Sequence, residues 1–172
     1  PCQVHRHSAK LSGWRMSDDR IVHIELDQRT LTSRSPEVEH ERAVAIYDLL
    51  EENHFVPVGK FSGPYRIRLA IEDSNRLIFD IRGEADDAQG VITLPLTPFR
   101  RIIRDYYKIC ESYFDAIKRM TPSRIETIDL ARRALHDEGA AYLCDRLREK
   151  AELDTPTARR LFTLICVLHF RG

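Results

Sequence analysis

The sequence has no long hydrophobic run, and this absence argues against a membrane-spanning helix. A span needs about 18 to 20 apolar residues in a row, whereas the longest apolar run here is Leu164 to Leu168. Net charge is also absent, because 27 basic residues balance 27 acidic ones. We therefore expect a soluble protein without membrane contact, whose overall charge does not favour nucleic acid as a partner.

The sequence also lacks the motifs of the enzyme classes that are easiest to recognise. It has no phosphate loop, dinucleotide fingerprint, nucleophile elbow or paired-histidine metal motif. Its four cysteines, at positions 2, 110, 144 and 166, show no metal-ligand spacing, and the last three lie at apolar positions of predicted helices. We expect those three to be free and buried in a protein of the reducing cytoplasm. We expect no metal and no cofactor.

The first fifteen residues differ from the rest of the chain. They contain Arg6, Lys10 and Arg15 and no acidic residue. We interpret residues 1–15 as a disordered basic extension, either a targeting leader or an upstream segment. Residues 16–172 are long enough to form one α+β domain with its own core.

Proline follows a hydroxyl residue four times, each time ahead of a helical apolar pattern. A Ser or Thr side chain at the N-cap accepts a hydrogen bond from an orphan amide, and proline suits the first helical position. The third helix either ends near Gly139 or continues to about Lys150, because one glycine costs a helix only about 1 kcal/mol. The pairs that predict helix starts are Ser35-Pro36, Thr97-Pro98, Thr121-Pro122 and Thr155-Pro156.

Apolar and polar residues alternate over 65–72 and again over 76–82, which predicts a β-hairpin. The charge pattern favours a register in which Leu69 faces Phe79, because oppositely charged residues then meet on the outer face.

Further strands are expected at 20–27, 54–58 and 91–96, which gives the order β-α-β-β-β-β-α-α-α. Strands that cluster in sequence before the helices cluster indicate an α+β fold. We predict an antiparallel β-meander packed on one face by about four helices.

The second predicted helix opens with three arginines, Arg100, Arg101 and Arg104. Arginine is unfavourable near a helix N-terminus, where the backbone is already positive, so an anion is expected nearby. The anion is either a carboxylate of the chain itself, such as Glu39 or Glu41, or the phosphate or carboxylate of a ligand. Plain exposure to solvent is the remaining alternative.

The segment His136-Asp137-Glu138 is a second candidate, because a histidine that titrates near neutral pH lies beside two carboxylates. Consecutive helical residues point in different directions, so these three residues are not a ready-made catalytic group. Two arginine pairs, Arg132-Arg133 and Arg159-Arg160, could form a basic patch for RNA, but no stacking aromatic motif is interleaved with them.

Several segments together resemble the small bacterial proteins known as uncharacterised protein family 0262. The similarity extends over about 16–172, and the family has no established activity that the resemblance could transfer to this chain. The segments that carry it are 35–46 (SPEVEHERAVAI), 96–103 (LTPFRRII), 109–113 (ICESY), 158–168 (ARRLFTLICVL) and the closing Arg171-Gly172.

Two functional hypotheses follow. The first is a protein-interaction or regulatory domain, whose partner could be a second copy of the chain in a homo-oligomer. Helical arginine and tyrosine are residue types enriched at interfaces. The second is an anion-binding protein or enzyme in which Arg100, Arg101 and Arg104 hold the ligand and His136 or Glu111 transfers a proton. The absence of a catalytic motif favours the first, and the second predicts that these side chains converge on one pocket.

Overall fold

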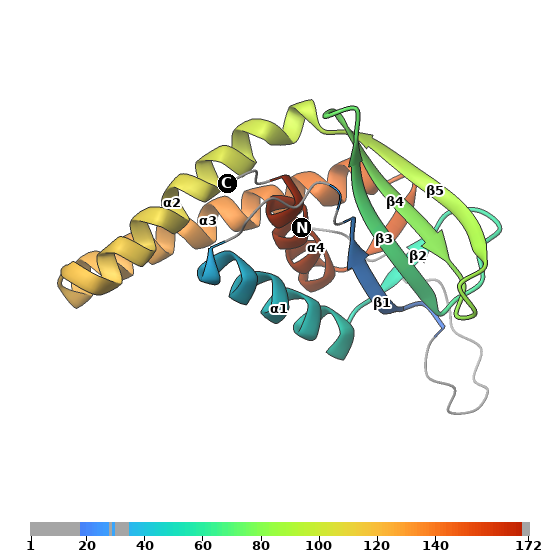
Figure 1. The fold of residues 1–172 in the computed structure, drawn as a ribbon, viewed down its shortest axis with the longest axis horizontal. Coiled ribbons are helices and arrows are strands. Elements are labelled where there is room, and N and C mark those ends of the chain that lie inside the picture. Colours follow the sequence, from blue (N-terminus) through green and yellow to red (C-terminus); the bar gives the residue numbers. More distant parts are fainter. Residues whose placement is uncertain (1–17, 28, 30–34, 170–172) are drawn as a thin grey trace.

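The computed structural model describes residues 18–27, 29 and 35–169. A four-stranded sheet lies at one side of the molecule, and the helices cover one of its faces and extend away from it (Figure 1). A short two-stranded sheet lies beside them. The elements are β1 (Ile21–Leu26), α1 (Pro36–Glu51), β2 (Phe55–Pro57), β3 (Tyr65–Glu72), β4 (Arg76–Arg82), β5 (Ala88–Pro95), a 3₁₀ turn (Thr97–Phe99), α2 (Arg100–Arg119), α3 (Pro122–Leu147), β6 (Ala151–Leu153) and α4 (Thr155–His169).

The four-stranded sheet has the order β1-β3-β4-β5 and confirms the predicted α+β class. Strands β3, β4 and β5 form the antiparallel meander, and Leu69 faces Phe79 as predicted. Asp73 and Ser74 have φ of 49° and 57°, the left-handed geometry that a tight hairpin turn needs. Strand β1 departs from the prediction because it pairs with β3 in parallel. Helix α1 supplies the crossover connection that a parallel pair requires.

Strand β6, which the sequence pattern does not predict, follows α3 and pairs with β2 in antiparallel fashion. Phe55 lies opposite Leu153 in this pair, and both side chains are buried. A strand of three residues has too short an alternation to be recognised from sequence. This second sheet joins the chain before the meander to the chain before α4.

Only one of the four predicted N-caps makes the expected side-chain hydrogen bond, and Thr121 stands at the N-cap of α3 without such a bond. Ser35 caps α1 as expected, since its Oγ accepts from the amide of Val38 at 3.3 Å. Thr97 instead hydrogen-bonds the Asn75 side chain, and α2 begins only at Arg100 after the 3₁₀ turn. At α4 the cap is Asp154, whose Oδ1 accepts from the amide of Thr157 at 2.9 Å.

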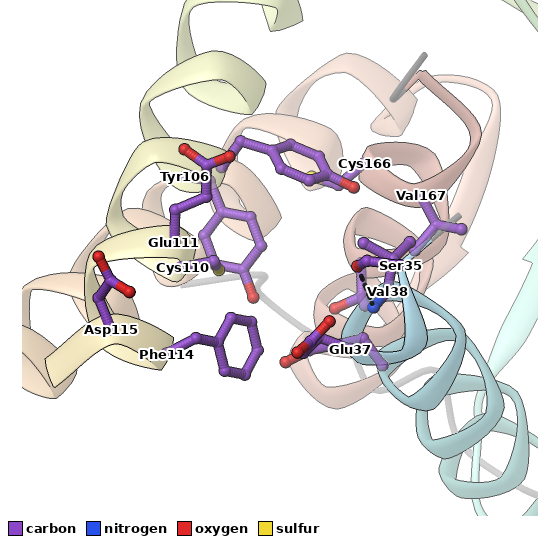
Figure 2. A pocket seen from close by; sticks show the side chains of 13 residues that line it. Ser35, Glu37, Val38, Tyr106, Cys110, Glu111, Phe114, Asp115, Cys166 and Val167 are labelled. Carbon is purple, nitrogen blue, oxygen red and sulfur yellow. Dashed lines mark hydrogen bonds between the residues drawn. The ribbon is translucent and has the colours of Figure 1, made fainter. Parts of the chain in front are cut away.

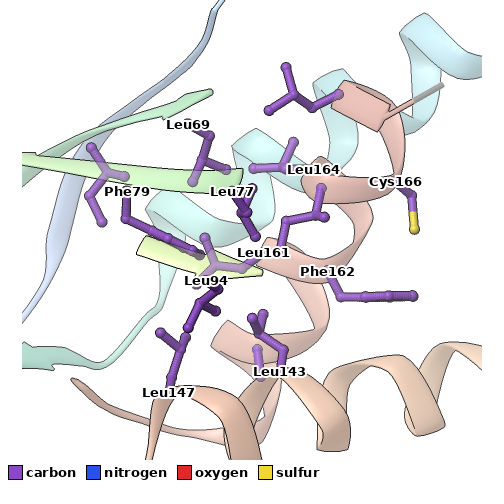
Figure 3. Packing of buried hydrophobic residues seen from close by; sticks show 14 of the residues in the cluster. Leu69, Leu77, Phe79, Leu94, Leu143, Leu147, Leu161, Phe162, Leu164 and Cys166 are labelled. Atoms are coloured by element: carbon purple, nitrogen blue, oxygen red, sulfur yellow. The ribbon is translucent and has the colours of Figure 1, made fainter. Parts of the chain in front are cut away.

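Helix α4 is the centre of the core, and all of its residues from Leu161 to Leu168 are buried. Figure 3 shows Leu161 and Leu164 directed toward Leu69, Leu77 and Leu94 of the sheet. Phe162 lies on another side of α4 and packs on Gly139 of α3. Helix α3 runs without interruption past Gly139 to Leu147. Of the two alternatives for its end, the longer helix is therefore the one that forms.

Candidate functional site

The three arginines near the start of α2 do not gather around a cavity. Arg100 is exposed and donates to the carbonyl of Ser74. Arg101 pairs with Glu138 at 3.1 Å and with Asp105 at 3.4 Å. Arg104 is exposed, and none of the three lines either cavity described below. Two carboxylates of the chain thus neutralise Arg101, and neither of them is Glu39 or Glu41.

The other two arginine pairs of the sequence do come together. Arg132 and Arg133 on α3 and Arg159 and Arg160 on α4 line a cavity of about 250 Å³, which we call the arginine pocket. Its walls are completed by Glu41 from α1, Tyr106 from α2, His136 from α3 and Thr163 from α4. Four helices therefore meet at this pocket, and the basic groups come from only two of them.

Three carboxylates pair with these four guanidinium groups. Asp129 contacts Arg132 at 2.7 Å and Arg133 at 2.8 Å. The hydrogen bond from Arg132 is the main cause that lowers the pKa of Asp129.

Arg159 and Arg160 each pair with a carboxylate on a different helix. Arg159 pairs with Asp137 of α3, and Arg160 pairs with Asp48 of α1 at 3.1 Å. Burial and the neighbouring Arg160 lower the pKa of Arg159. Of the residues that line the arginine pocket, four are arginines and one, Glu41, is acidic, while the carboxylates that pair with the arginines lie outside the lining.

His136 is 7% exposed and forms one wall of the arginine pocket. Its Nε2 lies 2.7 Å from the Thr163 hydroxyl, which in turn donates to the carbonyl of Arg159 at 3.2 Å. Since a hydroxyl has a single hydrogen, His136 is the donor in this pair and its Nδ1 is left as an acceptor. Burial, with the positive charges of Arg159 and Arg132, lowers the pKa of His136 to about 4, so the ring is neutral at pH 7.

The two residues after His136 point elsewhere, as the helical geometry requires. Asp137 pairs with Arg159 and Glu138 pairs with Arg101. The three side chains of the segment therefore contact the core, α4 and α2 separately. They do not form one acid–base group.

A larger cavity of about 480 Å³ lies beside the arginine pocket, and we call it the interhelical cavity. Figure 2 shows α2 on one side of it and α1 with α4 on the other. Its walls combine apolar and aromatic groups with several carboxylates, among them the predicted site residue Glu111. The lining residues are Ser35, Glu37, Val38, Glu41, Tyr106, Tyr107, Cys110, Glu111, Phe114, Asp115, Thr163, Cys166 and Val167.

The nucleophilic side chains of the interhelical cavity are protonated near neutral pH. Burial raises the pKa of the Cys110 thiol to about 11 and raises that of Cys166 as well. Burial likewise raises the pKa of Tyr106. Because a thiol reacts through its thiolate, these cysteines have the environment of core residues and not of nucleophiles.

The two cavities adjoin each other, because Glu41, Tyr106 and Thr163 line both. Together the cavities bring one predicted residue, His136, to the basic end and another, Glu111, to the apolar and acidic end. The arginine pairs were visible in the sequence as a possible RNA patch. Only the packing of α3 on α4 shows that they surround a cavity.

The remaining sequence predictions concern cysteines, metals and membranes. Cys110 and Cys166 are free and buried as expected, whereas Cys144 is partly buried and disulfide-bonded, so the prediction is wrong there. In the described part of the chain, no group of three or more His, Cys, Asp or Glu residues could hold a metal ion. None of the helices described is long and apolar enough to cross a membrane. Residues 1–15 lie outside the described residues.

The fold and its cavities define an α+β protein with a basic pocket and an adjoining apolar cavity between its helices. The chain belongs to the Uncharacterised protein family (UPF0262), whose family model matches residues 18–171. A UPF0262 protein of Ruegeria pomeroyi is 55% identical over 162 residues, which are 91% of this chain and 100% of the relative. One from Rhodospirillum rubrum is 57% identical over 154 residues, 90% of this chain and 94% of the relative.

The family resemblance inferred from the sequence is thereby confirmed, and the relatives are bacterial. A third relative, a UPF0262 protein of Brucella canis, is 56% identical over 154 residues, 89% of this chain and 95% of the relative. No solved structure matches the chain.

Proposed function

We propose that this protein binds a small organic molecule with an aromatic or apolar body in the interhelical cavity. The observation that carries the proposal is the cavity itself, since about 480 Å³ falls in the range of about 300 to 1,000 Å³ that is typical of ligand sites. Its apolar walls come from Val38, Phe114 and Val167 on three different helices. Such walls would cover a flat or branched apolar group from several sides.

The polar groups of the interhelical cavity favour binding over covalent catalysis. Cys110 and Cys166 are thiols at neutral pH because burial raises their pKa values. Glu111 is exposed at the cavity edge, where it could accept a hydrogen bond from a ligand. The arrangement therefore supports a binding protein, and it offers an enzyme no activated nucleophile among these groups.

The neutral dye N-phenyl-1-naphthylamine tests this proposal, because its fluorescence rises in an apolar site. Val167 is 3% exposed and lines the cavity, so Val167→Phe should fill the space and reduce dye binding about tenfold or more. The matched control is Val58→Phe, since Val58 is 62% exposed and lies outside the lining residues. Equal dye binding by both variants and the parent protein would overturn the proposal. If Val167→Phe does not fold, Phe114→Ala serves in its place, because it removes an apolar wall of the cavity and should also reduce dye binding.

A protein-interaction role is a second candidate, and exposed apolar side chains favour it. Ile117 and Leu130 are 51% and 61% exposed. They belong to α2 and α3, two helices that project together from the rest of the molecule (Figure 1). Tyr106, by contrast, is buried and unavailable to a partner. Light scattering over a concentration series tests for a homo-oligomer, which the variant Ile117→Ser with Leu130→Ser should weaken. A mass that stays monomeric at every concentration counts against self-association.

A further inference from the structure

We infer that the arginine pocket is an anion site, and that it binds a carboxylate or phosphate group of the ligand whose apolar body occupies the interhelical cavity. The inference deepens the proposed function and rests on it for the ligand body. The anion site itself can be tested separately with inorganic phosphate. Arg133, Arg159 and Arg160 are the residues that we assign to the anion.

These three arginines retain hydrogen-bond donors after their internal contacts are counted. A guanidinium group has five N–H donors in a fixed fork. Arg159 pairs with Asp137 through Nη1, and Arg160 pairs with Asp48 through Nη2. Arg133 reaches Asp129 through Nε and is 64% exposed. A planar carboxylate or a phosphate can accept two donors at once from such a fork.

Arg132 has a different role in the pocket. Its Nε and Nη2 both donate to Asp129, at 3.0 and 2.7 Å, and its guanidinium lies 5.0 Å from the centre of the Tyr113 ring. These contacts fix it more firmly than its neighbours. We therefore do not assign Arg132 to direct contact with the anion.

Glu41 sets the boundary between the two cavities. It is partly buried and lines both of them, and no ion pair of Glu41 within 4.0 Å is found in the described part of the chain. A carboxylate at this position repels an anion that approaches the junction, so it favours an anion seated toward Arg159 and Arg160. Removal of this charge should therefore strengthen anion binding.

The small volume of the arginine pocket favours a small molecule over an RNA strand. The arginine pocket is a cavity of about 250 Å³, and one of its walls is the buried pair of His136 and Thr163. Sequence-tolerant RNA binding uses an open basic groove with exposed aromatic rings. Tyr106, the aromatic residue of the arginine pocket that comes from α2, is 5% exposed.

Isothermal titration calorimetry with a matched ligand pair tests the inference. The probes are 3-phenylpropanoate, its neutral analogue 3-phenylpropan-1-ol, and inorganic phosphate. The parent protein should bind the carboxylate about tenfold tighter than the alcohol, as expected for charge-assisted hydrogen bonds. The double variant Arg159→Gln with Arg160→Gln should lose this difference and should also lose phosphate binding. Glu41→Gln should raise the affinity for both anions.

The matched control removes two arginines that line neither cavity. Arg100→Gln with Arg104→Gln changes the charge by the same amount as the double variant in the arginine pocket, and should leave the affinities unchanged. If Arg159→Gln with Arg160→Gln does not fold, Arg133→Gln replaces it, because that side chain is 64% exposed.

The outcomes separate the inference from the proposed function. Equal affinities for carboxylate and alcohol overturn the anion site and leave the binding protein standing. Phosphate binding that depends on Arg159 and Arg160, without binding of either aromatic probe, supports the anion site and overturns the apolar ligand. No binding of any probe overturns both. Binding of a uridine dodecamer in place of the small probes identifies an RNA surface and overturns the inference.

Discussion

Gly139 of α3 lies against the ring of Phe162 of α4, so close that a Cβ at position 139 would stand 2.2 Å from the Cζ of that ring. Both residues are buried, and Phe162 is fully so. Glycine is therefore what allows the two helices to approach each other at this level. The contact lies one turn from His136 and thereby also positions the arginine pocket.

Gly139→Ala should destabilise the protein by about 1 to 3 kcal/mol, because overpacking costs that much in a filled core. Helix propensity alone predicts the opposite, a gain of about 1 kcal/mol. Urea unfolding followed by circular dichroism measures the free energy of unfolding. In the double variant, Phe162→Leu should recover part of the loss caused by Gly139→Ala. A stabilised Gly139→Ala variant would contradict the close packing of α3 on α4.

Asp154→Ala should lower the free energy of unfolding by about 1 kcal/mol, the usual cost of losing an N-cap. Its side chain accepts from the amide of Thr157, whereas Thr155 is exposed. Thr155→Ala is the matched control and should change stability by less than about 0.5 kcal/mol. A larger effect at Thr155 than at Asp154 would restore the cap that the sequence pattern predicted. Chemical denaturation of the two variants side by side decides between them.

Asn53→Ala should cost about 2 kcal/mol, because it leaves part-buried backbone groups without this partner. The Asn53 side chain accepts from the amide of Ile21 at 2.7 Å and donates to the carbonyls of Ile21 and Leu49 at 2.9 and 2.8 Å. It thus joins the start of β1 to the end of α1. Hydrogen exchange at β1 should accelerate in the variant. The exposed neighbour Glu52 provides the control, and Glu52→Ala should leave that exchange unchanged.

Acidification should destabilise the protein through His136. Its pKa is about 4 in the folded protein and 6.5 when unperturbed, so the unfolded chain takes up a proton that the folded chain refuses. Stability is therefore lost as the pH falls from 6.5 toward 4, by about 2 kcal/mol between pH 7 and pH 5. Below pH 4 this residue contributes no further loss.

The variant His136→Gln isolates this contribution, because glutamine can still donate to Thr163 but does not titrate. Its free energy of unfolding should depend less steeply on pH between 7 and 5 than that of the parent protein. The exposed His40 is the control, and His40→Gln should keep the parental slope. Parallel slopes for the parent protein and His136→Gln would exclude the buried neutral histidine.

Local patterns in the sequence predicted those parts of the fold that depend on neighbouring residues. The hairpin register of β3 and β4 is an example, because alternation along each strand leaves one register that buries Leu69 and Phe79 together. The cap at Ser35 is another, since the bond to Val38 is made within one helical turn. The cap predicted at Thr97 failed because Asn75, distant in sequence, binds that hydroxyl.

The site was less predictable than the fold, because its residues come from four helices. His136 and Glu111 were identified as candidates, but they lie at two different cavities. The arginines that the helix dipole argument selected, Arg100 and Arg101, have partners on the surface. No local pattern separates these from Arg159, because the difference is only whether a cavity lies beside the guanidinium group.

By itself the sequence determined the α+β class, the helix starts set by neighbouring residues, the meander register and the family. Tertiary structure alone decided that β1 joins the sheet in parallel, that β6 exists, and that two arginine pairs from α3 and α4 surround one pocket. The physical reason is the distance along the sequence over which each interaction acts. Periodicity and capping act over a few residues, whereas a cavity and its charge depend on which side chains distant in sequence are brought together when α4 is buried.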